Sequence, residues 1–173
     1  MPLSLYEATV PTFQQIMGAV AGLLDKAEAH CAAKGLADSD LIEARLAPDM
    51  FTFNYQVKST AVHSIGAIEA LANGAFSPDL TPPPTSFAAL KGRVADARAA
   101  LDAVTPDQLN AYEGRDMAFS FREFRMDFTA ENFLLSFSLP NFYFHAATVY
   151  DILRHQGLPI GKRDFMGEMR IKP

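Results

Sequence analysis

Apolar residues recur every three or four positions in three stretches of the chain, which is the spacing of amphipathic helices. The first stripe consists of Val10, Phe13, Met17, Val20, Leu24, Ala27 and Cys31. It predicts a helix over Val10–Lys34, with Thr9 as its N-cap and Gly35 as its C-cap. Pro11 is tolerated because it would lie in the first turn.

Two further stripes predict helices over Met50–Ala72 and Phe87–Val104. Their members are Met50, Phe53, Val57, Ala61, Ser64, Ile68 and Leu71 in one, and Phe87, Leu90, Val94, Ala97, Leu101 and Val104 in the other. Asp49 is placed to cap the first of these helices, and Thr85 or Ser86 to cap the second.

The connections between these helices are long. A capping-box-like start and a stop at Pro48 predict a short helix over Asp38–Leu46. Asn73–Ser86 holds four prolines in fourteen residues, which predicts a surface crossover without regular structure. Thr105–Gln108 has the cap, proline and capping-box residues of another short helical turn.

Between Met117 and Phe137 the period of the apolar residues changes to two, which predicts β-strands. The alternating residues are Met117, Phe119 and Phe121, then Phe124, Met126 and Phe128, and finally Phe133, Leu135 and Phe137. A shift of phase near Arg122-Glu123 predicts a hairpin with a bulge. Because eight of the fourteen phenylalanines lie between Phe119 and Phe144, we expect the hairpin to pack on the end of a bundle.

A fourth helix is predicted over Asn141–His155, opened by Pro140 and closed by Gly157 and Pro159. The chain is therefore predicted to be all-α, a four-helix bundle with long crossovers and a β-hairpin inserted before the last helix. Its 173 residues are expected to form a single domain.

Composition narrows the class of protein. With 49% hydrophobic and 20% charged residues the chain is globular, and its net charge of −5 argues against nucleic acid or an anionic membrane as a partner. The longest apolar run, Ile16 to Leu24, is nine residues, about half of a membrane span. A single cysteine and no basic leader before an apolar stretch lead us to expect a cytoplasmic protein.

Several kinds of chemistry lack their sequence motifs. The chain contains neither G-x-G-x-x-G nor G-x-x-x-x-G-K-[ST], and no Glu-x-x-His pair of the di-iron bundles. Cys31 continues the first stripe and is expected to be a small apolar filler. Gly161–Asp164 could grip an anion, form a solvated turn or clamp back onto the bundle. A metal in this bundle would have to be held by histidine and carboxylate.

Four histidines are present, and helical geometry distinguishes them. His145 shares the apolar face of the fourth helix, where it is either a core histidine with hydrogen-bond partners or part of a functional site. His63 is predicted about 120° from Val57, the centre of the second stripe, and therefore off the core face. His155 is predicted in the last turn of its helix, where the helix dipole favours a basic side chain. No specific role is predicted for His30.

Stretches at Arg45–Phe51, Leu139–His145, Tyr150–His155 and Gly161–Phe165 resemble a bacterial and fungal family of unknown function grouped with the DinB/YfiT-like superfamily. The resemblance implies a four-helix bundle that is often a homodimer. It also implies a divalent metal held by three histidines, one on the second helix and an H-x-x-x-H pair on the last. Known activities of the superfamily include thiol-dependent transferases and isomerases.

Carried over residue by residue, this resemblance is incomplete. His145 matches the first histidine of the last-helix pair, but Val149 stands where the second would be, and His63 matches the second-helix ligand only in its helix. The resemblance implies a degenerate metal site, with zinc or nickel as the candidate ion. We therefore expect a binding or interaction protein with a small-molecule ligand near His145; the alternative is a divalent-metal-dependent hydrolase or a thiol-dependent transferase using His145 and His63.

Self-association is also expected. The resemblance implies a homodimer, and small or moderately apolar residues flank the first two core stripes, namely Ile16, Leu23, Ser59, Gly66 and Ala70. Small residues off the core face would let a second copy approach closely.

Overall fold

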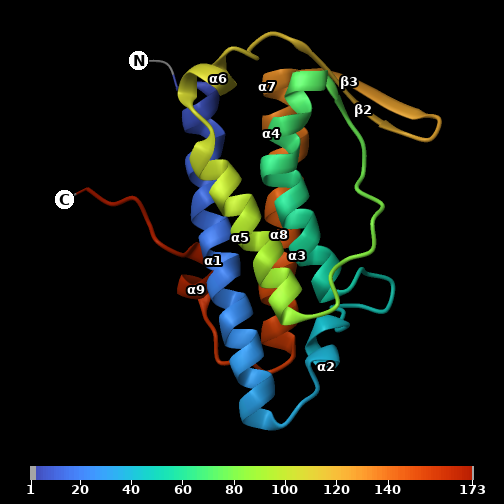
Figure 1. Ribbon diagram of the computed structural model, residues 1–173, viewed down its shortest axis with the longest axis vertical. Helices are drawn as coiled ribbons and strands as arrows, with labels where there is room; N and C mark the ends of the chain where they lie inside the picture. Colours follow the sequence, from blue (N-terminus) through green and yellow to red (C-terminus); the bar gives the residue numbers. More distant parts are fainter. Residues whose placement is uncertain (1–2, 173) are drawn as a thin grey trace.

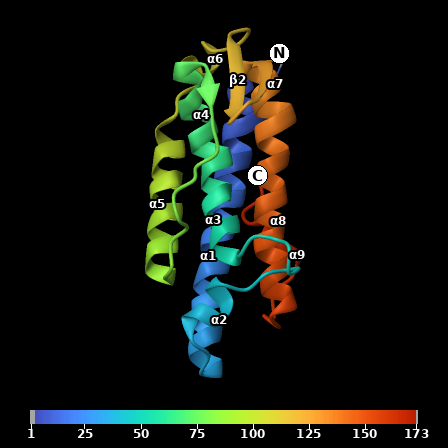
Figure 2. The ribbon, with the colours of Figure 1, turned by 90° about the vertical axis from the view of Figure 1, so that its right-hand side faces the viewer.

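Four long helical segments lie side by side in the computed structural model, which describes residues 3–172 (Figures 1 and 2). They are α1 (Leu5–Lys34), residues 53–73, α5 (Phe87–Ala103) and residues 130–155. α1 packs mainly on α5, the second segment packs mainly on the fourth, and these two pairs face each other. The predicted four-helix bundle is confirmed.

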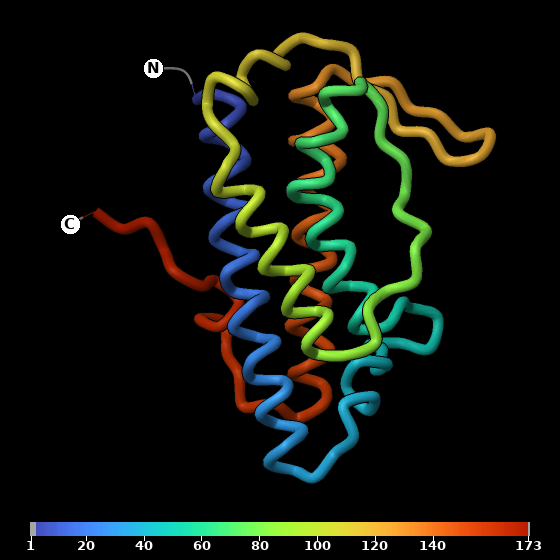
Figure 3. Tube along the Cα trace, in the orientation of Figure 1, coloured from blue at the N-terminus to red at the C-terminus, as the bar shows by residue number. Residues whose placement is uncertain are grey.

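The direction of the helices follows from the long crossover. Residues 53–73 run against α1, the crossover then returns along the length of the bundle, and α5 runs in the same direction as residues 53–73 (Figure 3). The last segment reverses the direction again (Figure 1). The bundle is therefore not a simple up-and-down ring, because a long crossover joins two helical segments that run in the same direction.

α1 begins earlier than predicted. Its N-cap is Ser4, whose hydroxyl accepts from the Glu7 amide in a capping box, so the prediction of Thr9 as the cap is wrong. Thr9 is buried inside the helix and satisfies its hydroxyl by donating to the Leu5 carbonyl. Gly35 ends the helix with a φ of 65°, a left-handed conformation that favours glycine, as predicted.

The second segment is a helix interrupted by one wide turn. Its pieces are α3 (Phe53–Ala61), the π-helical η1 (Val62–Gly66), α4 (Ala67–Ala70) and the 3-10 turn η2 (Leu71–Asn73). The prediction of Asp49 as its cap is wrong, because Asp49 is exposed in a turn and Thr52 stands at the cap position. The short helix before it, α2, covers Asp38–Ile42.

The fourth segment contains a second wide turn. It consists of α7 (Ala130–Asn132), the π-helical η3 (Phe133–Ser138) and α8 (Leu139–His155), so the strand predicted at Phe133–Phe137 is wrong. The physical reason is that Phe133 and Phe137 are four residues apart and share a helical face, where their rings stack at 5.5 Å. Leu135 between them is 42% exposed.

A small sheet lies near one end of the bundle, beside α4 and α7, and its hairpin projects outward (Figure 1). β2 (Asp116–Phe121) and β3 (Phe124–Thr129) pair antiparallel in regular register, and β1 (Ala75–Phe76) pairs parallel with β2. The predicted bulge is wrong because Arg122 and Glu123 are the two-residue turn itself, with Arg122 at a φ of 55°. β1 lies in the crossover that was predicted to lack regular structure.

Two predicted helix caps are confirmed, and the last short helix packs back onto the bundle. Ser86 caps α5, and Thr105 caps α6 (Pro106–Asn110) in a capping box, both as predicted. α9 (Lys162–Met166) folds back onto α1, where Asp164 pairs with Lys26. Of the alternatives for Gly161–Asp164, the described structure supports the clamp.

The residues of the predicted apolar stripes form most of the core, and the core also includes side chains outside these stripes. Cys31 is buried as predicted, but Ile16 and Leu23 are also buried, at 5% and 1% exposure. Their expected place on an exposed flank is therefore wrong, because α1 contacts α5, α8 and α9 and so buries more than one stripe. Among residues 3–172, no helix combines the length and apolar character needed to cross a bilayer.

Candidate functional site

The two histidines singled out by the sequence lie against each other. His63 on η1 and His145 on α8 have ring centroids 5.5 Å apart and ring planes only 17° from parallel. The expectation that His63 lies away from the core face is wrong. His155 is exposed at the end of α8, and His30 lies on α1.

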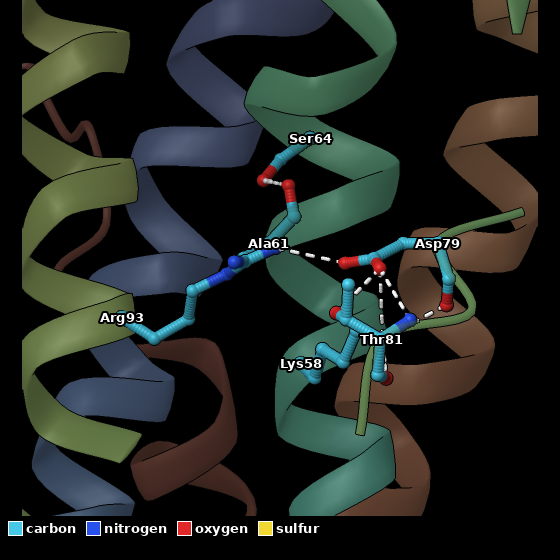
Figure 4. Close-up of polar contacts among 6 residues, drawn as sticks. All are labelled: Lys58, Ala61, Ser64, Asp79, Thr81 and Arg93. Atoms are coloured by element: carbon cyan, nitrogen blue, oxygen red, sulfur yellow. Dashed lines mark hydrogen bonds and ion pairs between the residues drawn. The ribbon is translucent and has the colours of Figure 1, made fainter. Parts of the chain in front are cut away.

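The π-helical turn η1 gives His63 its position. A wider turn breaks the α-helical register, so the wheel drawn for a continuous helix no longer applies there. The Ser64 hydroxyl donates to backbone carbonyls of this stretch, to that of Thr60 at 2.9 Å and to that of Ala61 at 3.1 Å. Figure 4 shows the bond to Ala61. The His63 carbonyl accepts from Ser138 of η3 at 2.7 Å, which ties the two π-helical turns together.

His145 is fixed in one tautomer by Gln56 of α3. The amide NH₂ of Gln56 donates to the Phe51 carbonyl at 3.1 Å, so its oxygen faces Nδ1 of His145 at 2.7 Å. Because this oxygen can only accept, Nδ1 of the neutral ring carries the proton. Nε2 of His145 then keeps a lone pair, and no group among the described residues bonds it.

His63 also has a ring nitrogen without a hydrogen-bond partner. Its Nδ1 is the polar side-chain atom that is both buried and without a hydrogen-bond partner in the part of the chain described. A buried N–H without an acceptor costs more free energy than a buried nitrogen lone pair without a donor. The favoured tautomer of His63 therefore carries its proton on Nε2. The pair therefore offers one acceptor, Nε2 of His145, and one donor, the Nε2–H of His63.

Both rings are neutral over the ordinary pH range. Burial, and secondarily the proximity of His145, lowers the pKa of His63 to about 3. Burial lowers the pKa of His145 to about 4. Neutral imidazoles can lie in contact without charge repulsion, and neither ring forms an ion pair with any described residue.

Aromatic side chains surround the pair on both sides. Phe76 of β1 and Phe137 of η3 contact His63, with centroids 5.5 and 5.9 Å from its ring. Tyr55 of α3 and Phe144 of α8 contact His145 at 6.3 and 5.4 Å. The site is thus a polar pair set in an aromatic environment.

A buried ion pair fixes the crossover beside this site (Figure 4). Lys58 is 2% exposed; its ammonium donates to the Asp79 and Thr81 carbonyls at 2.8 and 2.5 Å and lies 3.1 Å from the Asp79 carboxylate. Although burial alone would raise it, hydrogen bonds from Thr81 and Lys58 lower the pKa of Asp79 to about 2. This clamp anchors the crossover that carries Phe76 to His63.

The residues present do not fit a three-ligand metal centre. No group of three histidine, cysteine, aspartate or glutamate side chains placed to hold an ion occurs in residues 3–172. Val149, four residues after His145, is fully buried in the core. Since catalytic zinc is usually held by three protein ligands, the two histidines are one ligand short of that set, and an ion on them alone stays a prediction.

Residues 5–166 match DUF1993, a family described as a domain of unknown function. The chain belongs to this family. A crystal structure of a DinB family member protein from Shewanella denitrificans is similar, with a TM-score of 0.81 and 28% identity over 98% of this chain and 95% of that one. No curated protein matches the chain in sequence. The resemblance drawn from the sequence is confirmed: this is a DinB-like bundle of a family of unknown function.

Proposed function

We propose that this DUF1993 chain is a binding protein that holds a small uncharged ligand at the His63–His145 pair. The observation that carries the proposal is the 2.7 Å hydrogen bond from His145 to Gln56, because it leaves Nε2 of His145 as a fixed acceptor. A ligand that donates to this nitrogen and accepts from His63 would complete both rings. Carboxamides and alcohols have that combination of groups.

The electrostatics of the pair favour a neutral ligand. Both imidazoles are uncharged above about pH 5, because their pKa values lie at about 3 and 4. An anion would find no opposite charge on these rings, and its desolvation would not be repaid. An uncharged ligand of moderate size avoids that cost.

The alternative, a metal-dependent hydrolase or thiol-dependent transferase using His145 and His63, has less support. It needs at least one more ligand, and the residue one turn beyond His145 is the buried Val149. The hydrogen bond to Gln56 leaves the Nε2 lone pair of His145 available to a ligand donor or to a metal alike. What counts against the alternative is that the described residues place no third histidine, cysteine or carboxylate beside the pair.

An NMR titration of the ¹⁵N-labelled protein tests the proposal. Cyclohexanecarboxamide, which has a donor and an acceptor, should shift the ring nitrogens of His63 and His145, whereas cyclohexanecarboxylate at neutral pH should not. His145→Ala should abolish the response, and His155→Ala, a change at an exposed histidine of the same helix, should leave it intact. No response to the amide would contradict the proposal.

Elemental analysis of untagged protein purified without chelator addresses the metal alternative. We expect no stoichiometric zinc or nickel in the wild-type protein or in His155→Ala. A stoichiometric ion that disappears in His145→Ala would replace the proposal by the metal-dependent alternative.

A further inference from the structure

Three aromatic side chains lie about His145, and we call them together the aromatic wall: Phe51, Tyr55 and Phe144. Phe51 and Tyr55 stack at 3.9 Å with their planes 19° apart. Tyr55 meets His145 edge-on at 6.3 Å, and Phe144 meets the same ring edge-on at 5.4 Å. Tyr55 of α3 and Phe144 of α8 thus both contact this imidazole, and Phe51 of the loop before α3 stacks on Tyr55.

The aromatic wall remains open to solvent. Phe51 is 58% exposed and Phe144 is 56% exposed, although both belong to the cluster that reaches the half-buried His145. A single exposed phenylalanine is ordinary, but rings gathered around a partly exposed polar atom are the composition of a ligand site. Such a site has apolar walls and few polar groups.

Gln56 connects the wall to the histidine pair. Its side chain donates to the Phe51 carbonyl and accepts from His145, so one buried residue sets both the loop that carries Phe51 and the tautomer of His145. The Met50 carbonyl next to it accepts from Arg45 at 2.5 Å, which further fixes this loop. The wall and the acceptor nitrogen are therefore held in a fixed relation.

We propose that the ligand of the histidine pair carries an aromatic ring, which stacks on the aromatic wall while its uncharged amide or hydroxyl group bonds the two imidazoles. This inference rests on the proposed function and adds the class of ligand, an aromatic carboxamide or alcohol. Offset and edge-to-face ring contacts supply affinity beyond the area they bury, which an aliphatic ring cannot match.

The test compares benzamide with cyclohexanecarboxamide, which share the polar group and differ in the ring. Dissociation constants come from the NMR titration of the His145 ring nitrogens in the full chain. Benzamide should bind roughly three- to tenfold more tightly, and Phe144→Ala should remove most of that preference. Phe124→Ala is the matched control, since Phe124 is equally exposed, at 56%, but lies at the turn of the hairpin.

The outcomes separate the two proposals. Equal binding of the two amides, or a preference for benzamide that survives Phe144→Ala, overturns the aromatic ligand and leaves the binding site standing. Binding of neither amide overturns both. If Phe144→Ala instead converts a dimer to a monomer in sedimentation and leaves amide binding unchanged, the wall is a subunit contact and the inference fails.

Discussion

Lys58 shows how single residues shape this site. It lies on the α3 segment that also supplies Gln56, yet its ammonium is buried against the crossover rather than in solvent. A buried charge is tolerated only when it is paired and hydrogen-bonded, and Asp79 and Thr81 provide this. The chain thereby anchors a proline-rich connection that has little regular structure of its own.

Breaking this pair should be costly. Lys58→Met removes the donor to two carbonyls and the buried ammonium that pairs with the Asp79 carboxylate, which keeps only Thr81 and Arg93 as donors. It should lower the free energy of unfolding by about 3 kcal/mol. Lys91→Met removes a more exposed contact with Asp25 and Glu28 and should cost less than about 1 kcal/mol. Urea denaturation of both variants measures the difference, and equal losses would mean that the buried pair has no special role.

The histidine pair predicts a pH dependence. The folded-state pKa values of about 3 and 4 lie below the ordinary value of 6.5, so below about pH 6.5 the unfolded chain binds protons that the folded chain does not. Stability is therefore highest above this pH and falls on acidification, by at most about 1.4 kcal/mol per pH unit for each histidine.

A comparison of variants isolates this effect from that of the carboxylates. Between about pH 6 and pH 5, His145→Gln should lose less unfolding free energy than the wild type, while His155→Gln should behave like the wild type. Chemical denaturation at the two pH values gives the slopes. Identical slopes for all three proteins would show that His145 is not held neutral.

Among the secondary-structure elements, the two π-helical turns η1 and η3 are the ones that the apolar pattern of the sequence does not predict. The stripes located the long helices because continuous α-helices keep an apolar period of 3.6 residues. The same rule gave a wrong prediction for the orientation of His63, which lies in η1, and wrongly predicted a strand at Phe133–Phe137, which lies in η3. His145 was found because α8 is regular there. Gln56 was missed, although its place three residues after the buried Phe53 could have indicated a residue facing the interior.

The contact between these two turns can be tested. Ser138 is fully buried and donates to the His63 carbonyl, so Ser138→Ala removes a buried hydrogen bond between the two turns and should cost about 1–3 kcal/mol of unfolding free energy. Ser136→Ala, in the same turn but exposed, removes a hydrogen bond to Asn132 and should cost less. Thermal unfolding distinguishes them; a Ser138→Ala variant as stable as Ser136→Ala would argue against the link.

For the whole molecule, we propose that two copies of the chain associate as a homodimer. Ile16, Leu23 and Ser59 are buried within one copy and are not available for an interface. Gly66 and Ala70 are half-buried and line an open cleft of about 590 Å³ between α4 and α5. A Cβ at Gly66 would meet only the Ala61 carbonyl, at 3.9 Å, so a side chain can be introduced there without a clash.

We expect a homodimer in sedimentation equilibrium across a wide concentration range. If the second copy contacts this face, Gly66→Glu should shift the protein toward monomer while leaving its thermal stability nearly unchanged. A monomer at every concentration would remove the dimer, and a dimer insensitive to Gly66→Glu would place the interface elsewhere.

The central claim is that His145 presents a fixed acceptor nitrogen beside a second neutral imidazole. A long-range ¹H–¹⁵N correlation spectrum of the histidine rings at neutral pH tests it most directly, because protonated and unprotonated ring nitrogens have different ¹⁵N shifts. We expect a protonated Nδ1 and an unprotonated Nε2 for His145, the reverse for His63, and a mixture of tautomers for His145 in Gln56→Leu. A wild-type His145 that is protonated on Nε2, or charged at neutral pH, would contradict it.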